Sequence, residues 1–221
     1  MRLAAIAQLC YSVHALPQGY PSIPMLGVEG SIDMPLVGVG TWQYNDSIAA
    51  QTVVNAFKLG YRHVDTANVY KNQNGVSSGL AIAIKEVGLR REDYFVTSKI
   101  PGGLNETSTW AALEEDLSLL KLNYVDLMLI HWPSPDNNAS IIKQQWLTLE
   151  KWAKAGKARA IGVSHYCQKH LEAIFSVATL PVGLNQNQYH VGMATDSQPR
   201  LHDKMFNEKH NIIYMSYSSL C

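Results

Sequence analysis

From residue 36 onward, this 221-residue chain alternates short runs rich in β-branched residues with amphipathic segments of helical period. The runs predicted as buried strands are 36–40, 63–65, 94–99, 124–131, 158–164, 182–186 and 212–216. Such regular alternation predicts a parallel sheet, either a (β/α)8 barrel or a doubly wound sheet. No Gly-x-Gly-x-x-Gly follows the first strand, which argues against a dinucleotide-binding doubly wound domain.

Local signals define the elements around these strands. A hairpin is predicted over 22–35, with its turn near Glu29 and Gly30. Apolar residues recur at helical spacing between the strands, as in Ala50, Val53 and Phe57. From capping preferences, Asp46 or Ser47 is predicted to cap one helix and Ser140 another, and a helix between them is predicted to start at Thr107 or Ser108. The apolar face of a further helix is predicted over 80–87.

Composition excludes several classes of function. The net charge is +0 and the pI is about 7.1, so nothing indicates a nucleic-acid partner. No stretch is long and apolar enough to predict a membrane span. The three cysteines, Cys10, Cys167 and Cys221, have no metal or disulfide spacing. We therefore expect one large domain, over 23–221, preceded by a separate N-terminal segment, 1–22.

That N-terminal segment has two interpretations. Arg2, the apolar run 3–10 and the small residues Val13 and Ala15 fit a secretory signal peptide, which would place the protein in the secretory pathway. Three Asn-x-Ser/Thr triplets, at 45, 105 and 138, could then accept glycans. The alternative is a ragged extension or a wrongly assigned start codon.

Four polar residues come at or just after the ends of successive predicted strands: Asp65, Tyr70, Lys99 and His131. In a barrel, the carboxyl ends of the strands meet at one mouth, where active sites lie. A tyrosine is a slow acid at neutral pH, and an adjacent ammonium such as Lys99 would favour release of its proton. Asp65 could hold Lys99, and His131 could donate a hydrogen bond to a substrate carbonyl. This set predicts general acid catalysis on a carbonyl that accepts a hydride. An Asp65–Lys99 ion pair with Tyr70 as ordinary packing is the alternative.

A metal centre is a second alternative. Enough nitrogen and oxygen donors for the zinc of a barrel hydrolase are present in His63, Asp65, His131, His165 and His190. His63 and Asp65 share one strand face, but nothing in the sequence makes His165 and His190 converge on them. We therefore predict no metal site.

The motifs together resemble the aldo-keto reductase family over residues 23–220. The matching pieces are Met34-Pro-Leu-Val-Gly-Val-Gly-Thr-Trp42, Gly60-Tyr-Arg-His-Val-Asp-Thr-Ala67, Tyr70-Lys-Asn72, Thr97-Ser-Lys99, Leu127-Met-Leu-Ile-His-Trp-Pro133, Ile161-Gly-Val-Ser164, Asn185-Gln186 and Tyr214-Met-Ser-Tyr-Ser218. They follow one another in the order typical of that family.

The resemblance implies a (β/α)8 TIM barrel that reduces an aldehyde or ketone with NADP(H), usually in the cytoplasm. It makes Tyr70 the proton donor, tuned by Lys99 and Asp65, with His131 orienting the carbonyl. The cofactor-binding residues that it implies are Gly40, Thr41, Ser164, His165, Gln186, Tyr217 and Ser218. Of these, Ser164 and Gln186 would bind the carboxamide and Tyr217 would stack on the nicotinamide. Trp42 and Trp132 would wall the pocket of a small carbonyl substrate.

The chain also departs from the family pattern. His165 stands where the family usually has Asn, and Gln73 where it favours Glu. The family's eighth strand, its basic 2′-phosphate site and its C-terminal loop would follow Cys221. We therefore expect an incomplete barrel of about seven strands, a monomer or one that associates through a strand edge. A catalytically inactive barrel fragment is the alternative to an active reductase.

Overall fold

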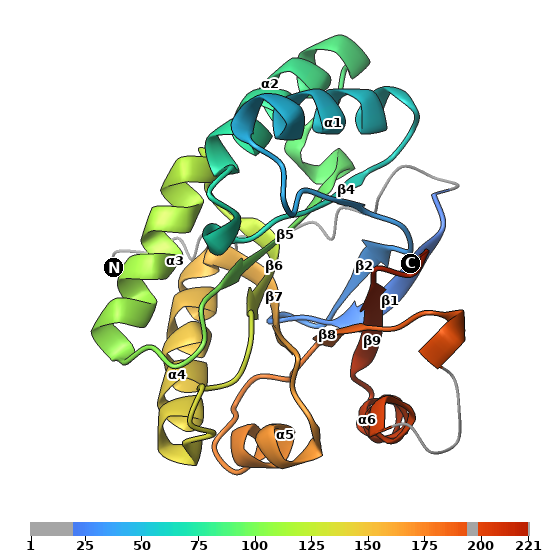
Figure 1. Cartoon of the computed structure of the whole chain (residues 1–221). Helices are drawn as coiled ribbons and strands as arrows, with labels where there is room; N and C mark the ends of the chain where they lie inside the picture. Colours follow the sequence, from blue (N-terminus) through green and yellow to red (C-terminus); the bar gives the residue numbers. More distant parts are fainter. Residues whose placement is uncertain (1–19, 194–198, 221) are drawn as a thin grey trace, which may run out of the picture.

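A computed structural model describes residues 20–193 and 199–220 (Figure 1). An antiparallel hairpin of β1 (Ser22–Leu26) and β2 (Ser31–Pro35) precedes a parallel seven-stranded sheet. The sheet consists of β3 (Val39–Gly40), β4 (His63–Asp65), β5 (Phe95–Ile100), β6 (Val125–Ile130), β7 (Ala158–Ser164), β8 (Leu184–Gln188) and β9 (Ile213–Tyr217). The predicted signal segment lies outside the described residues.

The sheet order runs from β3 to β9 without reversal, each strand pairing in parallel with the next along the chain. A doubly wound sheet would reverse its order, so this topology is that of a (β/α)8 barrel with seven strands described. The prediction of the fold is confirmed, and all seven predicted strands are present. The helices are α1 (Asp46–Lys58), α2 (Gln73–Val87), α3 (Glu106–Leu120), α4 (Ala139–Trp152), α5 (Gln168–Phe175) and α6 (Pro199–Lys209).

Two apolar layers hold the barrel together. The outer layer lies between the sheet and the helices that cover its outer side (Figure 1). Trp146 and Trp152 of α4 belong to this layer and are fully buried. The inner layer fills the floor of the barrel, where Met25, Ile32 and Met34 of the hairpin meet the inward side chains of the strands. The hairpin therefore closes the bottom of the barrel and leaves the carboxyl ends of the strands as the open face.

Three helices begin earlier than predicted because asparagine, rather than the hydroxyl or carboxylate residues, caps them. The Asn45 side chain accepts a hydrogen bond from the backbone N–H of Ile48, and Asn105 does the same with Ser108. Asn138 caps α4 through the N–H groups of Ser140 and Ile141. Asparagine is among the most favourable N-cap residues. The three Asn-x-Ser/Thr triplets thus have a structural reason to occur.

Helix α2 begins at Gln73, well before its predicted apolar face. Its first turns pack tightly against α1, and a Cβ on Gly75 would lie 2.2 Å from the carbonyl oxygen of Asp46. Gly79 meets Ala50 in the same way, at 2.6 Å. Glycines carry no apolar signal, so the sequence pattern missed this half of the helix. No helix in the described part of the chain is long and apolar enough to cross a membrane.

Candidate active site

A cavity of about 480 Å³ opens at the carboxyl ends of the strands. Its lining residues are Gly40, Thr41, Trp42, Asp65, Val69, Tyr70, His131, Trp132, His165, Gln186, Tyr217 and Ser218. Eleven of the thirteen residues singled out in the sequence thus line one cavity. Lys99 and Ser164 lie behind its wall, fully buried. Val69 is the one lining residue that the sequence did not predict.

Strand alternation explains why these side chains meet. Side chains two apart on a strand point to the same face, so Phe95, Thr97 and Lys99 of β5 all face the barrel interior. Phe95 belongs to the apolar floor, and Thr97 bonds His63 of β4 one layer higher, at 2.8 Å. Lys99 and Asp65 form the next layer, at the mouth. The strands therefore stack apolar, polar and ionised layers from floor to mouth.

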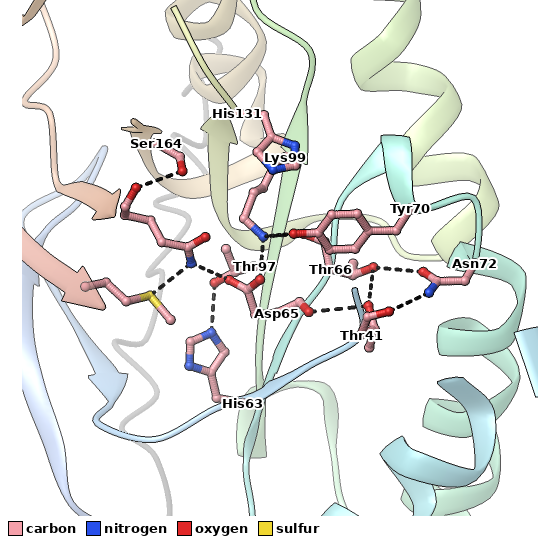
Figure 2. A network of polar contacts seen from close by, with 12 residues as sticks. Thr41, His63, Asp65, Thr66, Tyr70, Asn72, Thr97, Lys99, His131 and Ser164 are labelled. Atoms are coloured by element: carbon pink, nitrogen blue, oxygen red, sulfur yellow. Dashed lines mark hydrogen bonds and ion pairs between the residues drawn. The ribbon is translucent and has the colours of Figure 1, made fainter. Parts of the chain in front are cut away.

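Lys99 is the centre of the polar network (Figure 2). Its ammonium donates to the Asp65 carboxylate, to the carbonyl oxygen of Thr66 at 2.9 Å and to the Tyr70 hydroxyl at 3.3 Å. An ammonium has three donors, and all three are used. Burial alone would lower the pKa of Lys99, but Asp65 and Tyr70 outweigh it and raise that pKa. Lys99 is therefore positively charged at neutral pH and fixed in position.

The pKa of Tyr70 moves in the opposite direction from the sequence-based expectation. Burial raises it by more than the nearby Lys99 ammonium lowers it, and the Asp65 carboxylate adds to the increase. The sequence could not predict this, because desolvation depends on tertiary packing. Tyr70 consequently keeps its proton at neutral pH. Its hydroxyl oxygen accepts a hydrogen bond from the Lys99 ammonium, which would stabilise a phenolate.

His131 is electrically neutral across the physiological range. Burial lowers its pKa to about 3, assisted by the positive charge of Lys99 and by His165. Its ring packs edge-on against Tyr70, with centroids 5.6 Å apart. Nδ1 is buried and has no hydrogen-bond partner among the described residues. Nε2 is thus the ring nitrogen available to a molecule in the cavity.

Gln186 joins the network from the opposite side of the barrel. Its amide donates to the second oxygen of Asp65 at 2.7 Å and approaches the sulfur of Met215 at 3.4 Å. The two oxygens of the Asp65 carboxylate therefore accept from different partners, one from the Lys99 ammonium and the other from the Gln186 amide. Ser164 is fully buried and donates to the carbonyl oxygen of Gln186 at 2.8 Å. In this arrangement Ser164 braces Gln186 and does not line the cavity.

The remaining predicted residues lie around the mouth. Trp42 is 59% exposed at the rim, and the Trp132 ring lies 4.5 Å from that of His131. Tyr217 ends β9 and Ser218 follows it with a left-handed φ of 52°. Gly40 ends β3, beside Thr41. The cavity therefore has an aromatic rim and polar walls.

The donors of the alternative metal site do not gather into one cluster. Within the described residues, no group of three or more His, Cys, Asp or Glu side chains could hold a metal ion. His63 bonds Thr97 one layer below the mouth, and both nitrogens of His165 bond protein groups.

The sequence model of the Aldo/keto reductase family matches residues 36–221. The chain belongs to the aldo/keto reductase family. The resemblance inferred from the motifs is thereby confirmed, and the mouth of this aldo/keto reductase barrel is the place where the family motifs converge.

Curated relatives support the assignment. The chain is 42% identical over 168 residues to the glyoxal reductase of Bacillus subtilis (strain 168), covering 74% of this chain and 57% of that enzyme. It is 32% identical over 222 residues to the NAD(P)H-dependent D-xylose reductase I,II of Candida tropicalis, covering 90% and 67%. The chain thus spans less than two thirds of the length of the Bacillus enzyme.

Solved structures agree with this fold. An aldo/keto reductase from Brucella melitensis superimposes with a TM-score of 0.77 at 32% identity, covering 91% of this chain and 73% of that one. An aldo-keto reductase of Bombyx mori in complex with NADP gives 0.78 at 29% identity, covering 90% and 66%.

One support of the aldo/keto reductase site is not predicted from the sequence. The Thr41 hydroxyl donates to that of Thr66 at 2.9 Å, and the Thr66 hydroxyl donates to the Asn72 side chain at 3.4 Å (Figure 2). Asn72 donates back to the carbonyl oxygens of Thr41 and Tyr44. These bonds tie the loops after β3 and β4 together behind Tyr70. The signal was present, because Asn72 belongs to a family motif, but the sequence alone does not show its partners.

Proposed function

We propose that this chain binds NADP(H) at the barrel mouth and reduces an aldehyde or ketone to the alcohol, with Tyr70 as the proton donor. The observation that carries the proposal is the buried Lys99 ammonium, which bonds two residues that line the cavity, Asp65 and the Tyr70 hydroxyl, from behind its wall. A phenol held against a buried ammonium can release its proton to an adjacent oxygen, because the resulting phenolate is stabilised at once.

The residues on the β7–β9 side of the cavity fit a nicotinamide. Tyr217 contributes an aromatic ring, Gln186 an amide and Ser218 a hydroxyl to the same wall. No Lys or Arg lines the described cavity, so the fit concerns the nicotinamide end rather than the phosphates. When bound, the dinucleotide supplies the hydride that the carbonyl carbon accepts.

The chain's own residues then have separate roles. His131, neutral at working pH, donates a hydrogen bond from Nε2 to the carbonyl oxygen and polarises it. Tyr70 gives its phenol proton to the same oxygen, and Lys99 stabilises the phenolate that forms. Asp65 fixes the ammonium, while Trp42 and Trp132 shield the reacting atoms from water. The names of the relatives make small aldehydes and aldoses the first substrates to test.

The test combines cofactor titration with turnover. We expect NADPH to quench the protein's fluorescence and small aldehydes to be reduced. Tyr70→Phe keeps the ring and removes only the acid, so turnover should fall about 10²–10⁴-fold while NADPH binding changes little. Tyr61→Phe, at the opposite end of β4, is the matched control and should retain turnover.

Two results would contradict the proposal. Tyr70→Phe with more than about a tenth of the activity would assign the proton to another group, and His131 would be the next candidate. NADPH binding without reduction of any aldehyde or ketone would favour the inactive barrel fragment.

A further inference from the structure

His165 forms a bridge between three strands at the mouth of the cavity. Its Nδ1 lies 2.8 Å from the carbonyl oxygen of His131, which follows β6, and 2.9 Å from the Ser164 hydroxyl. Its Nε2 lies 2.9 Å from the hydroxyl of Tyr217, at the end of β9. The imidazole therefore connects β6 and β9 through β7.

The chemistry of the partners determines the direction of each bond. A carbonyl oxygen can only accept, so Nδ1 must carry the hydrogen that points at His131. Ser164 donates its own proton to the carbonyl oxygen of Gln186, which leaves its oxygen as an acceptor for the same Nδ1–H. With a single hydrogen, on Nδ1, the neutral imidazole has an accepting Nε2, and the Tyr217 hydroxyl is then the donor of the bond between them.

The backbone directs the ring into this position. His165 has a φ of 63°, in the left-handed region, and its N–H donates to the carbonyl oxygen of Gln186 at 3.0 Å. Histidine is among the non-glycine residues that tolerate this conformation best. The imidazole is consequently held over the mouth by its backbone as well as by its two nitrogens.

Tyr217 needs such a tether because of its place in the sheet. It is the last residue of β9, which pairs with β8 alone and is an edge strand among the described residues. Its ring lines the cavity at a centroid distance of 5.5 Å from His165. A side-chain bond that passes over β8 to β7 fixes the ring far better than the ladder at a strand end.

We propose that His165 is a positioning residue. Its Nε2 holds the Tyr217 ring against the cavity, while its Nδ1–H donates to the carbonyl oxygen of His131. It follows that His165 does not donate to a nicotinamide carboxamide, and that Gln186 is left for that contact. The cofactor part of this inference rests on the proposed function, whereas the tautomer and the tether do not.

The first experiment needs no cofactor. ¹⁵N-labelled histidine NMR on the full chain should show His165 protonated at Nδ1 and unprotonated at Nε2 near pH 7. Tyr217→Phe keeps the ring but removes the donor, and it should shift the Nε2 signal of His165 while leaving the Nδ1–H in place. Protonation at Nε2 instead, or an unchanged signal in Tyr217→Phe, would overturn the tether.

The second experiment uses a matched pair of amide variants. An asparagine amide can replace Nδ1 but is too short to reach Tyr217, whereas a glutamine amide can reach the position of Nε2 and accept from the phenol. We expect His165→Asn and Tyr217→Phe each to weaken NADPH binding about two- to tenfold, the range for one lost hydrogen bond. The double variant should be no weaker than either single variant, and His165→Gln should restore most of the affinity.

The outcomes of these experiments distinguish failure of the His165 tether from failure of the proposed reductase function. Additive losses, or equal losses in His165→Asn and His165→Gln, would overturn the positioning role. If wild-type chain does not bind NADPH, the proposed function fails, and the NMR experiment alone decides whether the tether exists. Circular dichroism of every variant checks that the fold is retained.

Discussion

Asp116 on α3 offers the sharpest test of the electrostatics beneath the active site. Its side chain is fully buried, and its Oδ1 accepts a hydrogen bond from the Gln73 amide at 2.9 Å. Burial raises the pKa of Asp116 from 3.8 to about 7, although Ser98, Gln73 and the charge of Lys99 favour the ionised form. The folded chain therefore holds a proton that the unfolded chain releases at a much lower pH.

The sign of the effect follows from proton binding. Between pH 3.8 and pH 7 the folded state binds a proton that the unfolded state has lost, so the free energy of unfolding falls as the pH rises. The slope is about 1.4 kcal/mol per pH unit, and it disappears below pH 4 and above about pH 7. Between pH 5 and pH 8, Asp116 should therefore decrease the stability by about 3 kcal/mol.

Asp116→Asn removes this titration and keeps the shape. The amide oxygen can still accept from Gln73, and the NH₂ group replaces the acid O–H. Relative to wild type, the variant should gain about 3 kcal/mol of stability between pH 5 and pH 8. Urea denaturation followed by circular dichroism at both pH values measures the gain, and any constant effect of the substitution cancels.

Glu106→Gln is the matched control, because Glu106 lies in the first turn of the same helix with a half-exposed side chain. The effect of Glu106→Gln on the free energy of unfolding should differ by only a few tenths of a kcal/mol between pH 5 and pH 8. A stability difference for Asp116→Asn that is the same at pH 5 and pH 8 would refute the reasoning. Asp116 would then be ionised in the folded protein and paired with a cation.

Three further predictions concern His131, the start of α4 and the cofactor. The NMR signals of the His131 ring should stay constant from pH 5 to pH 8, because its pKa is about 3, and an inflection near pH 6.5 would contradict this. Asn138→Ala should reduce the free energy of unfolding by about 1 kcal/mol, whereas Asn138→Asp keeps a capping side chain and should not reduce it. Equal urea midpoints for Asn138→Ala and wild type would show that the Asn138 cap does not stabilise the protein. NADPH and NADH should bind with affinities within about tenfold of each other, because no Lys or Arg lines the described cavity and one charge-assisted phosphate contact is worth about 1.5–3 kcal/mol. Fluorescence titration measures both affinities, and a preference for NADPH of about a hundredfold would reveal a phosphate site elsewhere.

The sequence predicted the fold well because the barrel repeats one local pattern. Each strand is a short apolar run and each helix carries a periodic apolar face. The presence of these elements and their order along the chain could therefore be deduced from local sequence. The strand ends then placed Asp65, Lys99 and His131 at one mouth, as the structure has them. Helix starts were less accurate, because asparagine caps and the glycine-lined contact between α1 and α2 leave no apolar signal.

Gln73 illustrates where local reasoning ends. In the sequence it is a departure from the family, a lost carboxylate. In the structure its amide donates to Asp116, a buried carboxyl 43 residues further along the chain. A glutamate at this position would place two carboxyl groups against each other, so the glutamine is complementary to its partner.

By itself, the sequence determined the strand order, the mouth at which the chemistry lies and the residue types that gather there, because these follow from periodicity and from motifs a few residues long. Only the tertiary structure decided the protonation states. It raised the pKa of Tyr70, made His131 neutral and turned both nitrogens of His165 toward protein groups. The physical reason is that desolvation and hydrogen-bond direction depend on atoms contributed by strands and helices far apart in the chain, and no local pattern encodes their distances.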